Sequence, residues 1–401
     1  MKHMKKILLL GGSQQQVTAI ENAKAMGYET VLCDYLPDNP GRLKADKFYQ
    51  VSTTDKEAVL NVALLEKVDG VLAYASDPAA PTAAYVAEKM GLPGNPARSV
   101  EILCNKDQFR RFLSENGFHT PRAVSFDRLD LRPEDFTGMK FPVIIKPVDS
   151  SGSKGVSRAD DFSDMKAKAE QAMAYSRCGR IIVEEYVEMY GEQVAGDGLS
   201  VDGQLTVACF GDDHFDASCD NPFVPAAATF PCTLPDDMQT RIRNEIQRLL
   251  TLLGMKTCTY NFDIRMGRNG NVYLMEIAPR SGGNYIPQIV HRLTGMDMVK
   301  CSILAAMGEK IPSGFDKPEK GYYAYYALHS NISGRLKKLS FPEIPGMKML
   351  ENHILVQPGG EVRKFVGANA TMGIVVMAFE NNELMQHMIR NPGEWIEMEL
   401  E

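Results

Sequence analysis

Short apolar runs alternate with amphipathic stretches through the first quarter of the chain. The apolar runs lie at 7–10, 30–33 and 70–74, and apolar positions recur at helical spacing over 15–26, 57–66 and 79–90. Strands that alternate with helices are typical of a parallel sheet wound by helices. Residues 1–97 are therefore predicted to form an α/β, Rossmann-like N-terminal domain.

The first predicted strand ends in Gly11-Gly12-Ser13 and leads directly into a helix. This turn lacks the G-x-G-x-x-G spacing of a dinucleotide fingerprint, so two glycines and a serine in a tight turn explain it equally well. Ligands of open parallel sheets nevertheless bind beyond the carboxyl ends of the strands, where Gln14, Asp34 and Asp77 would gather. A ligand crevice is expected at this edge.

Proline residues at 93 and 96 break the alternation and indicate a boundary. Helical patterns follow over 99–116, 162–175, 238–253 and 287–308, with strand patterns over 143–145, 181–183, 193–200 and 204–209. Residues 260–265 and 271–277 flank an Asn-Gly pair, which predicts a hairpin. The stretch 211–235 shows no period and is predicted to be a long loop, and such loops usually carry function.

Beyond Pro312 the pattern changes to short β-type runs, closed by a helix near 383–390. Residues 313–401 are therefore predicted to form a small, mostly β module. With the α/β domain and the mixed middle region, the whole chain is expected to be a multidomain protein of α/β and α+β class.

Composition excludes several classes of function. A net charge of -7 leaves no basic field for nucleic acid, and no apolar run approaches the ~20 residues of a membrane helix. The eight cysteines contain no Cys-x-x-Cys pair, which favours free thiols in a reducing cytoplasm. The expected protein is cytoplasmic, with neither a membrane nor a nucleic acid as partner.

Lys146 ends a predicted strand and precedes a Gly/Ser loop over 149–155. Glycines let backbone amides approach an anion and an ammonium group supplies positive charge, so this pattern favours phosphate binding. The lysine precedes the glycines, so the motif is not a P-loop, and a surface hairpin with a solvated lysine is the alternative.

Asp263 and Glu276 each lie six residues from the Asn269-Gly270 turn, which is compatible with opposite positions on paired strands. Carboxylate oxygens completed by phosphate oxygens and water suit magnesium. The alternative is an exposed acidic pair, but apolar neighbours on both sides of each residue argue against it.

His214 lies in the predicted 211–235 loop. It is a candidate ligand for a substrate or a metal ion, and the alternative is a solvated loop histidine.

The order of these elements resembles the ATP-grasp superfamily. The resemblance rests on Lys106, on Lys146 before its loop, on Glu184-Glu185-Tyr186-Val187, on Glu192, on Asp263, and on the run from Glu276 to Asn284. It covers roughly 1–310 and points to the carboxylate–amine ligase members. It implies an ATP-grasp region over 98–312 with a small lid at 119–187, and a C-terminal extension.

The resemblance also implies roles for individual residues. Lys106 and Lys146 would hold the ATP phosphates, and the loop containing Ser151, Gly152, Ser153 and Gly155 would close over them. Glu184 and the Val187 backbone would bind adenine, and Glu192 would bind the ribose.

For the reacting groups, the resemblance implies that Asp263 and Glu276 bind Mg (or Mn). Arg280 and Lys146 are the expected catalytic residues, with the arginine beside the reacting carboxylate and the γ-phosphate. Small residues at Ser281, Gly282 and Gly283, with Asn284, would admit the substrate. Many relatives carry asparagine where this chain has Ala278, and Asn284 is the expected substitute.

The function implied is an ATP- and Mg-dependent ligase that activates a small carboxylic acid as an acyl phosphate and transfers it to an amine. One alternative is bicarbonate chemistry of the carbamoyl-phosphate synthetase or carboxylase kind, and another is a non-catalytic nucleotide-binding protein. The family resemblance also implies a possible homodimer.

Overall fold

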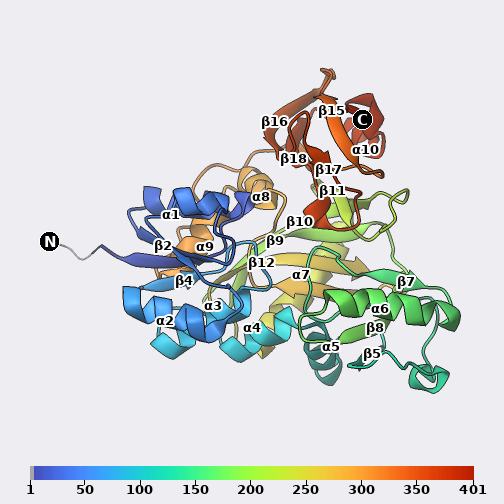
Figure 1. The fold of residues 1–401 in the computed structure, drawn as a ribbon, viewed down its shortest axis with the longest axis horizontal. Helices are drawn as coiled ribbons and strands as arrows, with labels where there is room; N and C mark the ends of the chain where they lie inside the picture. Colours follow the sequence, from blue (N-terminus) through green and yellow to red (C-terminus); the bar gives the residue numbers. More distant parts are fainter. Residues whose placement is uncertain (1–3) are drawn as a thin grey trace.

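The computed structural model describes residues 4–401, and four parallel strands in the order β3-β2-β1-β4 form its N-terminal lobe (Figure 1). The elements of this lobe are β1 (Lys6–Leu10), α1 (Gln14–Ala25), β2 (Glu29–Asp34), β3 (Lys47–Gln50), α2 (Lys56–Glu66), β4 (Gly70–Leu72) and α3 (Ala80–Met90). Ile7 and Leu9 pack with α1, whereas Leu8 and Leu10 pack with α2 and α3. Both faces of the sheet are thus covered, which explains its uninterrupted apolar strands and confirms the Rossmann-like prediction.

A four-stranded antiparallel sheet in the order β5-β8-β6-β7 forms a second lobe, called the lid here. Its elements are β5 (Ala123–Phe126), β6 (Val143–Pro147), β7 (Ser157–Ala159), α6 (Met165–Tyr175) and β8 (Ile181–Glu185). Val143 and Ile145 of β6 pack with Ala169 and Ala172 of α6, so one face of the sheet is buried by this helix. The other face is free to line a site.

An eight-stranded antiparallel sheet forms the centre of the molecule, in the order β13-β12-β9-β10-β11-β14-β18-β16. Its strands are β9 (Gln193–Val201), β10 (Gln204–Phe215), β11 (Pro225–Phe230), β12 (Cys258–Met266), β13 (Val272–Ala278), β14 (Tyr322–Leu328), β16 (Met347–Ile354) and β18 (Gly373–Phe379). The helices beside it are α4 (Ala97–Cys104), α5 (Lys106–Glu115), α7 (Asp236–Leu252), α8 (Ile286–Thr294) and α9 (Met298–Ala306).

The strands of the C-terminal part belong to two different sheets. Strands β14, β18 and β16 continue the central sheet beyond β11, and only β15 (Gly334–Ser340), β17 (Glu361–Val362) and β19 (Glu397–Leu400) form a separate small sheet. Helix α10 (Asn382–Arg390) packs with Trp395 in the core between them. This part rises above the other two lobes in Figure 1.

Two predicted helices are each broken in two. Asn105 is extended (φ -122°, ψ 109°) and separates α4 from α5, because its side chain accepts a hydrogen bond from the Gln108 amide as an N-cap. Gly295 adopts a left-handed φ of 73° and ends α8, and Asp297 then caps α9.

The predicted loop over 211–235 is wrong at 211–215 and 225–230, which are strands. Strand β10 continues to Phe215, and β11 pairs with both β10 and β14. The alternating pattern was hidden because Gly211, Asp212 and Asp213 interrupt the apolar positions. The segments 216–224, between the two strands, and 231–235, before α7, remain connecting loops.

No helix among residues 4–401 combines the length and the apolar character needed to cross a membrane. The eight cysteines all have free thiols, as expected from their spacing.

Candidate active site

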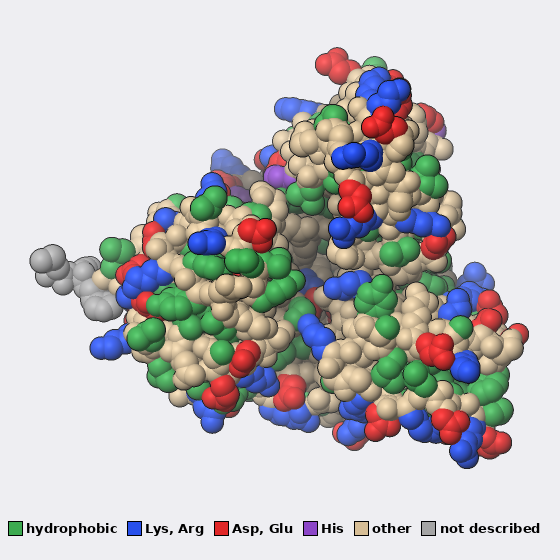
Figure 2. All heavy atoms as spheres, viewed as in Figure 1, with side chains coloured by type: hydrophobic (Ala, Val, Ile, Leu, Met, Phe, Trp, Pro, Cys, Tyr) green, Lys and Arg blue, Asp and Glu red, His purple; other side chains and the backbone are tan. Residues whose placement is uncertain are grey.

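A cavity of about 350 Å³ lies where the N-terminal lobe, the lid and the central sheet meet. In the space-filling view of Figure 2 a hollow lies between the three parts of the molecule, with basic side chains at its edge. Its charged lining residues are Asp77, Lys106, Lys146, Lys154, Glu184, Glu185, Asp213, Asp263, Arg265, Glu276 and Arg280. Acidic and basic side chains therefore meet at this cavity. Asp77 comes from the N-terminal lobe, and the others come from the lid and the central region.

Two lysines, Lys146 buried and Lys106 half-buried, are held by carboxylates on this cavity. Lys106, the first residue of α5, has its Nζ 3.3 Å from Glu276 Oε2 and donates to the Ser150 carbonyl at 2.8 Å. Lys146 Nζ lies 2.7 Å from Glu184 Oε2, and Arg110 Nε lies 2.9 Å from Glu184 Oε1. The predicted lysines thus line one cavity.

Burial and the neighbouring charges together set the pKa values of Lys146 and Glu184. Burial lowers the pKa of Lys146 to about 8. Burial opposes ionisation of Glu184 as well, but the cations of Arg110 and Lys146 lower the pKa of that carboxyl to about 2. A carboxylate with two cations is stable here, and an incoming anion would find Lys146 partly desolvated.

Asp263 and Glu276 are directly opposite each other in the register of β12 and β13, as the hairpin spacing predicted. Burial, followed by the facing Glu276 carboxylate, raises the pKa of Asp263 to about 7. Two facing carboxylates on a half-buried surface are stabilised by a cation, and hard oxygen donors suit Mg²⁺.

Strand alternation brings polar residues that the sequence analysis missed to the same face. Asn261, Asp263 and Arg265 line the cavity from β12, while Phe262 and Ile264 between them are buried in the core. Arg265 Nε donates to Gln193 Oε1 at 3.1 Å. Gln193 Nε2 in turn donates to Asp213 Oδ2 at 3.1 Å. Alternation along the strand around Asp263 would have identified Asn261 and Arg265, but not Asp213.

Arg280 makes a two-pronged ion pair with Asp77 of the N-terminal lobe. Nε and Nη2 each lie 2.7 Å from one carboxylate oxygen, and Nη1 donates to Asn261 Oδ1 at 3.0 Å. The strand-end crevice predicted to contain Asp77 therefore opens on the same cavity. A substrate carboxylate that binds Arg280 must compete with Asp77 for it.

The small-residue loop after Arg280 is held by a second buried carboxylate. Asp197 accepts hydrogen bonds from the Gly282 amide at 2.9 and 3.0 Å and from Asn261 Nδ2 at 3.1 Å. Burial raises the pKa of Asp197 to about 7. Of this loop, Gly283 and Asn284 line the cavity.

Asn261 rather than Asn284 stands beside Ala278, where many relatives carry asparagine. Asn261 and Ala278 are paired residues in the register of β12 and β13. A cross-strand neighbour can reach the same space as the missing side chain because facing Cβ atoms are only about 5 Å apart.

The glycine-rich flap, residues 150–155, lies over the cavity. Gly152 (φ 65°), Ser153 (φ 55°) and Gly155 (φ 73°) all have left-handed backbones. Ser153 Oγ donates to the Phe223 carbonyl at 2.7 Å, and the Ala368 amide donates to the Gly152 carbonyl at 3.2 Å. Residues 150–154 line the cavity, but Gly155 packs under Tyr175.

Two residues predicted to bind the nucleoside lie outside this cavity. Glu192 precedes β9, is 43% exposed and faces Arg390 at 3.7 Å, whereas its neighbour Gln193 points into the cavity. Val187 lines a separate cavity of about 320 Å³ beside the hairpin turn at 267–269. Glu192 points away because it directly precedes Gln193, the first residue of β9, and adjacent residues of an extended chain face opposite sides.

His214 does not lie in the cavity either. It is on β10 rather than in a loop, and its Nε2 is 2.9 Å from Thr229 Oγ1 on β11. Burial lowers the pKa of His214 to about 4, so the ring is neutral. Since Asp213 faces the cavity, the next residue on the strand faces away, which places His214 on the other side of β10 from the cavity.

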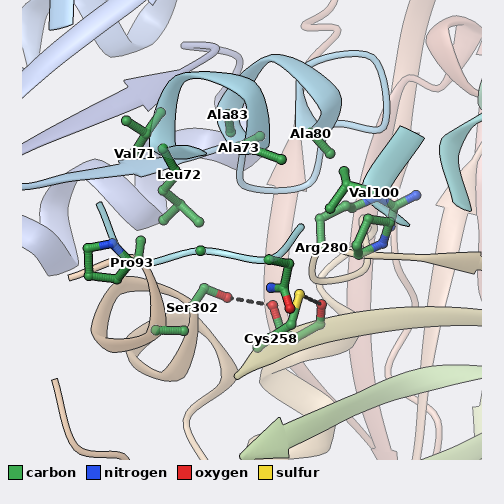
Figure 3. A pocket seen from close by; sticks show the side chains of 18 of the residues that line it. Val71, Leu72, Ala73, Ala80, Ala83, Pro93, Val100, Cys258, Arg280 and Ser302 are labelled. Carbon is green, nitrogen blue, oxygen red and sulfur yellow. Dashed lines mark hydrogen bonds between the residues drawn. The ribbon is translucent and has the colours of Figure 1, made fainter. Parts of the chain in front are cut away.

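A second, smaller cavity of about 80 Å³ lies behind Arg280 (Figure 3). Val71, Ala80 and Ala83 of the N-terminal lobe face Cys258 and Ser302 across it. Ser281 is buried here, with its Oγ 2.9 Å from Ser302 Oγ and 3.1 Å from Thr259 Oγ1. Ser281 thus helps to hold the loop at the lobe interface, while the charged groups all line the larger cavity.

Comparison with known proteins agrees with this geometry. Residues 139–288 match the ATP-grasp domain family. Among curated proteins, the formate-dependent phosphoribosylglycinamide formyltransferase of Rhodococcus jostii is 26% identical over 283 residues, covering 69% of this chain and 68% of that protein. The enzyme of the same name from Thioalkalivibrio sulfidiphilus is 30% identical over 191 residues, covering 46% and 47%. The chain spans about half the length of most curated relatives it matches.

Solved structures show the same fold over the whole chain. The L-amino acid ligase from Bacillus licheniformis has a TM-score of 0.82 at 21% identity, with 100% of both chains covered. The phosphoribosylglycinamide synthetase from Anaerococcus prevotii has a TM-score of 0.77 at 19% identity, again with 100% of both chains covered. Residues 139–288 thus match an ATP-grasp domain, and the chain as a whole has the fold of these ligase and synthetase structures.

Proposed function

We propose that the protein is an ATP-dependent ligase that joins a small carboxylic acid to an amine through an acyl phosphate, with release of ADP and phosphate. The observation that carries the proposal is the facing Asp263–Glu276 pair in a cavity that Lys106, Lys146 and Arg280 also line. The names of the relatives, formyltransferases and an amino acid ligase of the same fold, support it.

Each part of the cavity has a task in this reaction. Lys106 and Lys146 would bind the phosphates, and the flap would exclude water from them. Asp263 and Glu276 would hold Mg²⁺, whose charge would offset the repulsion between the two facing carboxylates. When bound, the ion supplies positive charge against the charge of the transferred phosphoryl group.

Arg280 would bind the acid once Asp77 releases it, because a planar guanidinium makes two parallel hydrogen bonds with a carboxylate. An amine does not displace oxide from a free carboxylate, whereas phosphate is a good leaving group. The nucleotide and the acid must therefore lie side by side, and the cavity joins their two binding regions.

A screen of acids and amines for ADP release tests the proposal. We expect release that needs both substrates, and we expect Glu276→Gln to lower it by about 10²-fold or more. The control Glu188→Gln changes an exposed carboxylate, 73% accessible, and should keep wild-type rates. Release that needs bicarbonate instead of an organic acid would favour the carboxylase alternative, and ATP binding without turnover would favour a binding protein.

A further inference from the structure

A cluster of three different ligand types lies outside the cavity, at the start of the 216–224 loop. Asp216, Cys219 and His329 each present one donor atom, and these atoms all lie within 4.8 Å of one another. Asp216 Oδ2 is 3.2 Å from His329 Nε2, and Cys219 Sγ is 2.8 Å from Asn331 Oδ1. Cys219 is buried, and the proposed function does not use any of these groups.

The imidazole of His329 is fixed in orientation by its surroundings. Its Nδ1 lies 2.7 Å from the Ala327 carbonyl, which accepts only if Nδ1 carries the proton. The ring stacks on Phe365 at a centroid distance of 4.4 Å, and Tyr326 lies at 5.6 Å on a nearly parallel plane. Histidine ligands of metal ions typically donate their second nitrogen to a carbonyl in this way.

With the proton on Nδ1, Nε2 of the neutral ring is an acceptor that faces a carboxylate acceptor. The contact is favourable only if a cation joins them or if the buried ring, whose side chain is 4% exposed, carries a second proton. Asp216 is also oriented by its surroundings, because its Oδ1 accepts hydrogen bonds from the amide and hydroxyl of Ser218 at 2.8 and 2.5 Å. Its Oδ2 faces His329 Nε2 and accepts one long hydrogen bond, from Asn331 Nδ2 at 3.4 Å.

We propose that Asp216, Cys219 and His329 form a binding site for a divalent transition metal ion, with Zn²⁺ as the ion that this donor set fits best. A thiolate, an imidazole and a carboxylate together are borderline-soft ligands that select Zn²⁺ over Mg²⁺ or Ca²⁺. Zinc–ligand bonds of about 2.0–2.3 Å require only small movements of donors this close together.

The site would tie the 216–224 loop to the end of β14. This loop supports the flap, since Asn221 Nδ2 donates to the Ser153 carbonyl at 2.9 Å and to the Val366 carbonyl at 3.0 Å. Bound metal would therefore stabilise the platform on which the flap rests. The consequence expected is a higher thermal midpoint and slower proteolysis of the loop.

The test is Zn²⁺ binding to the full-length chain, freed of metal by chelator and kept in excess MgCl₂ so that hard carboxylate sites are filled. We expect one Zn²⁺ per chain in competition with a chromophoric chelator, and at least about tenfold weaker binding for Cys219→Ser and His329→Ala. Matched controls are Cys178→Ser, an exposed thiol, and His387→Ala, an exposed histidine 3.0 Å from Glu394, which should both bind as wild type does.

A measurement on the unchanged protein guards against variants that fail to fold. Co²⁺ added in place of Zn²⁺ should produce a thiolate charge-transfer absorption that Cys219→Ser lacks and Cys178→Ser keeps. The proposal is overturned if the wild type binds no Zn²⁺, if Cys219→Ser binds it equally well, or if Co²⁺ binds without thiolate absorption. In those cases Asp216 and His329 form an ion pair only.

Discussion

Three cationic side chains of the cavity each form an ion pair with a carboxylate of the protein itself. Lys106 pairs with Glu276, Lys146 with Glu184, and Arg280 with Asp77. A buried charge without a partner is costly, so these pairs keep the cations ionised and oriented in the absence of a ligand. Binding then exchanges one anionic partner for another instead of desolvating a free cation.

The fork of Arg280 makes a substitution by lysine informative. We expect Arg280→Lys to keep ATP-analogue affinity but to lower ligation by about 10²-fold or more, because an ammonium cannot make two parallel hydrogen bonds with a carboxylate. Calorimetric titration and ADP release measure the two effects. Arg268→Lys, at a site 75% exposed, is the control, and near-normal ligation by Arg280→Lys would mean that the acid binds elsewhere.

Asp197 predicts a pH dependence of stability. Its folded pKa of about 7 lies above the unfolded value of about 3.9, so its contribution is fully present below pH 4 and is lost as pH rises through 7. We expect the stability of Asp197→Asn relative to wild type to rise by up to roughly 4 kcal/mol between pH 4 and pH 8. Urea unfolding at several pH values measures this difference.

The control for this experiment is Asp130→Asn, which changes a carboxyl 74% exposed. Its stability relative to wild type should stay constant over the same range. A constant difference for Asp197→Asn as well would mean that this carboxyl titrates normally in the folded protein.

At the scale of elements, strand parity decides which side chains reach the cavity. Along β9 and β10 the structure selects Gln193 and Asp213, and turns Glu192 and His214 away. The flap depends on a different property, namely left-handed backbone angles that only glycine adopts at little cost.

Gly152 and Gly91 allow this cost to be tested, since both have a φ of 65°. A Cβ at Gly91 meets nothing within 4 Å, whereas one at Gly152 would lie 3.1 Å from Ala368 Cβ. We expect Gly91→Ala to cost about 1 kcal/mol of stability without changing ATP-analogue affinity. Gly152→Ala should weaken that affinity about fivefold, because it destabilises the closed flap.

Titration of both variants with an ATP analogue makes the comparison, with thermal unfolding as the measure of stability. Equal affinity of Gly152→Ala and wild type would contradict a role of this flap conformation in nucleotide binding.

At the scale of the whole molecule, one sheet joins the ATP-grasp region to the C-terminal part. Ala227 to Phe230 of β11 pair with Tyr323 to Tyr326 of β14, and residues from both sides share one apolar core. The predicted boundary at 312 and 313 therefore falls between strands of a continuous sheet.

Removal of residues 313–401 should leave β11 as an exposed apolar edge strand. Such an edge pairs with other molecules, so we expect the 1–312 fragment to aggregate. Removal of residues 397–401 takes away only β19 from the small sheet and should leave a monodisperse protein. Size-exclusion chromatography compares the two, and a well-behaved 1–312 fragment would contradict the argument.

Local patterns in the sequence were enough to predict the parallel N-terminal sheet, the β12–β13 hairpin with its facing carboxylates, and Lys146 before its Gly/Ser loop. Each of these depends on interactions between near neighbours in the chain: apolar periodicity, an Asn-Gly turn, or a fixed count from that turn. The family resemblance added the order in which the motifs occur.

Only the tertiary structure decided which side chains the remaining site residues contact and on which face of a strand each of them lies. The contact between Arg280 and Asp77 spans 203 positions, and Asn261 comes to lie opposite Ala278 on the neighbouring strand. The parity of β9 and β10 depends on which neighbours bury Val194 and Phe210, and no local signal contains that information. Long-range packing chose these residues, because a strand can bury either face and takes the one that its neighbours cover.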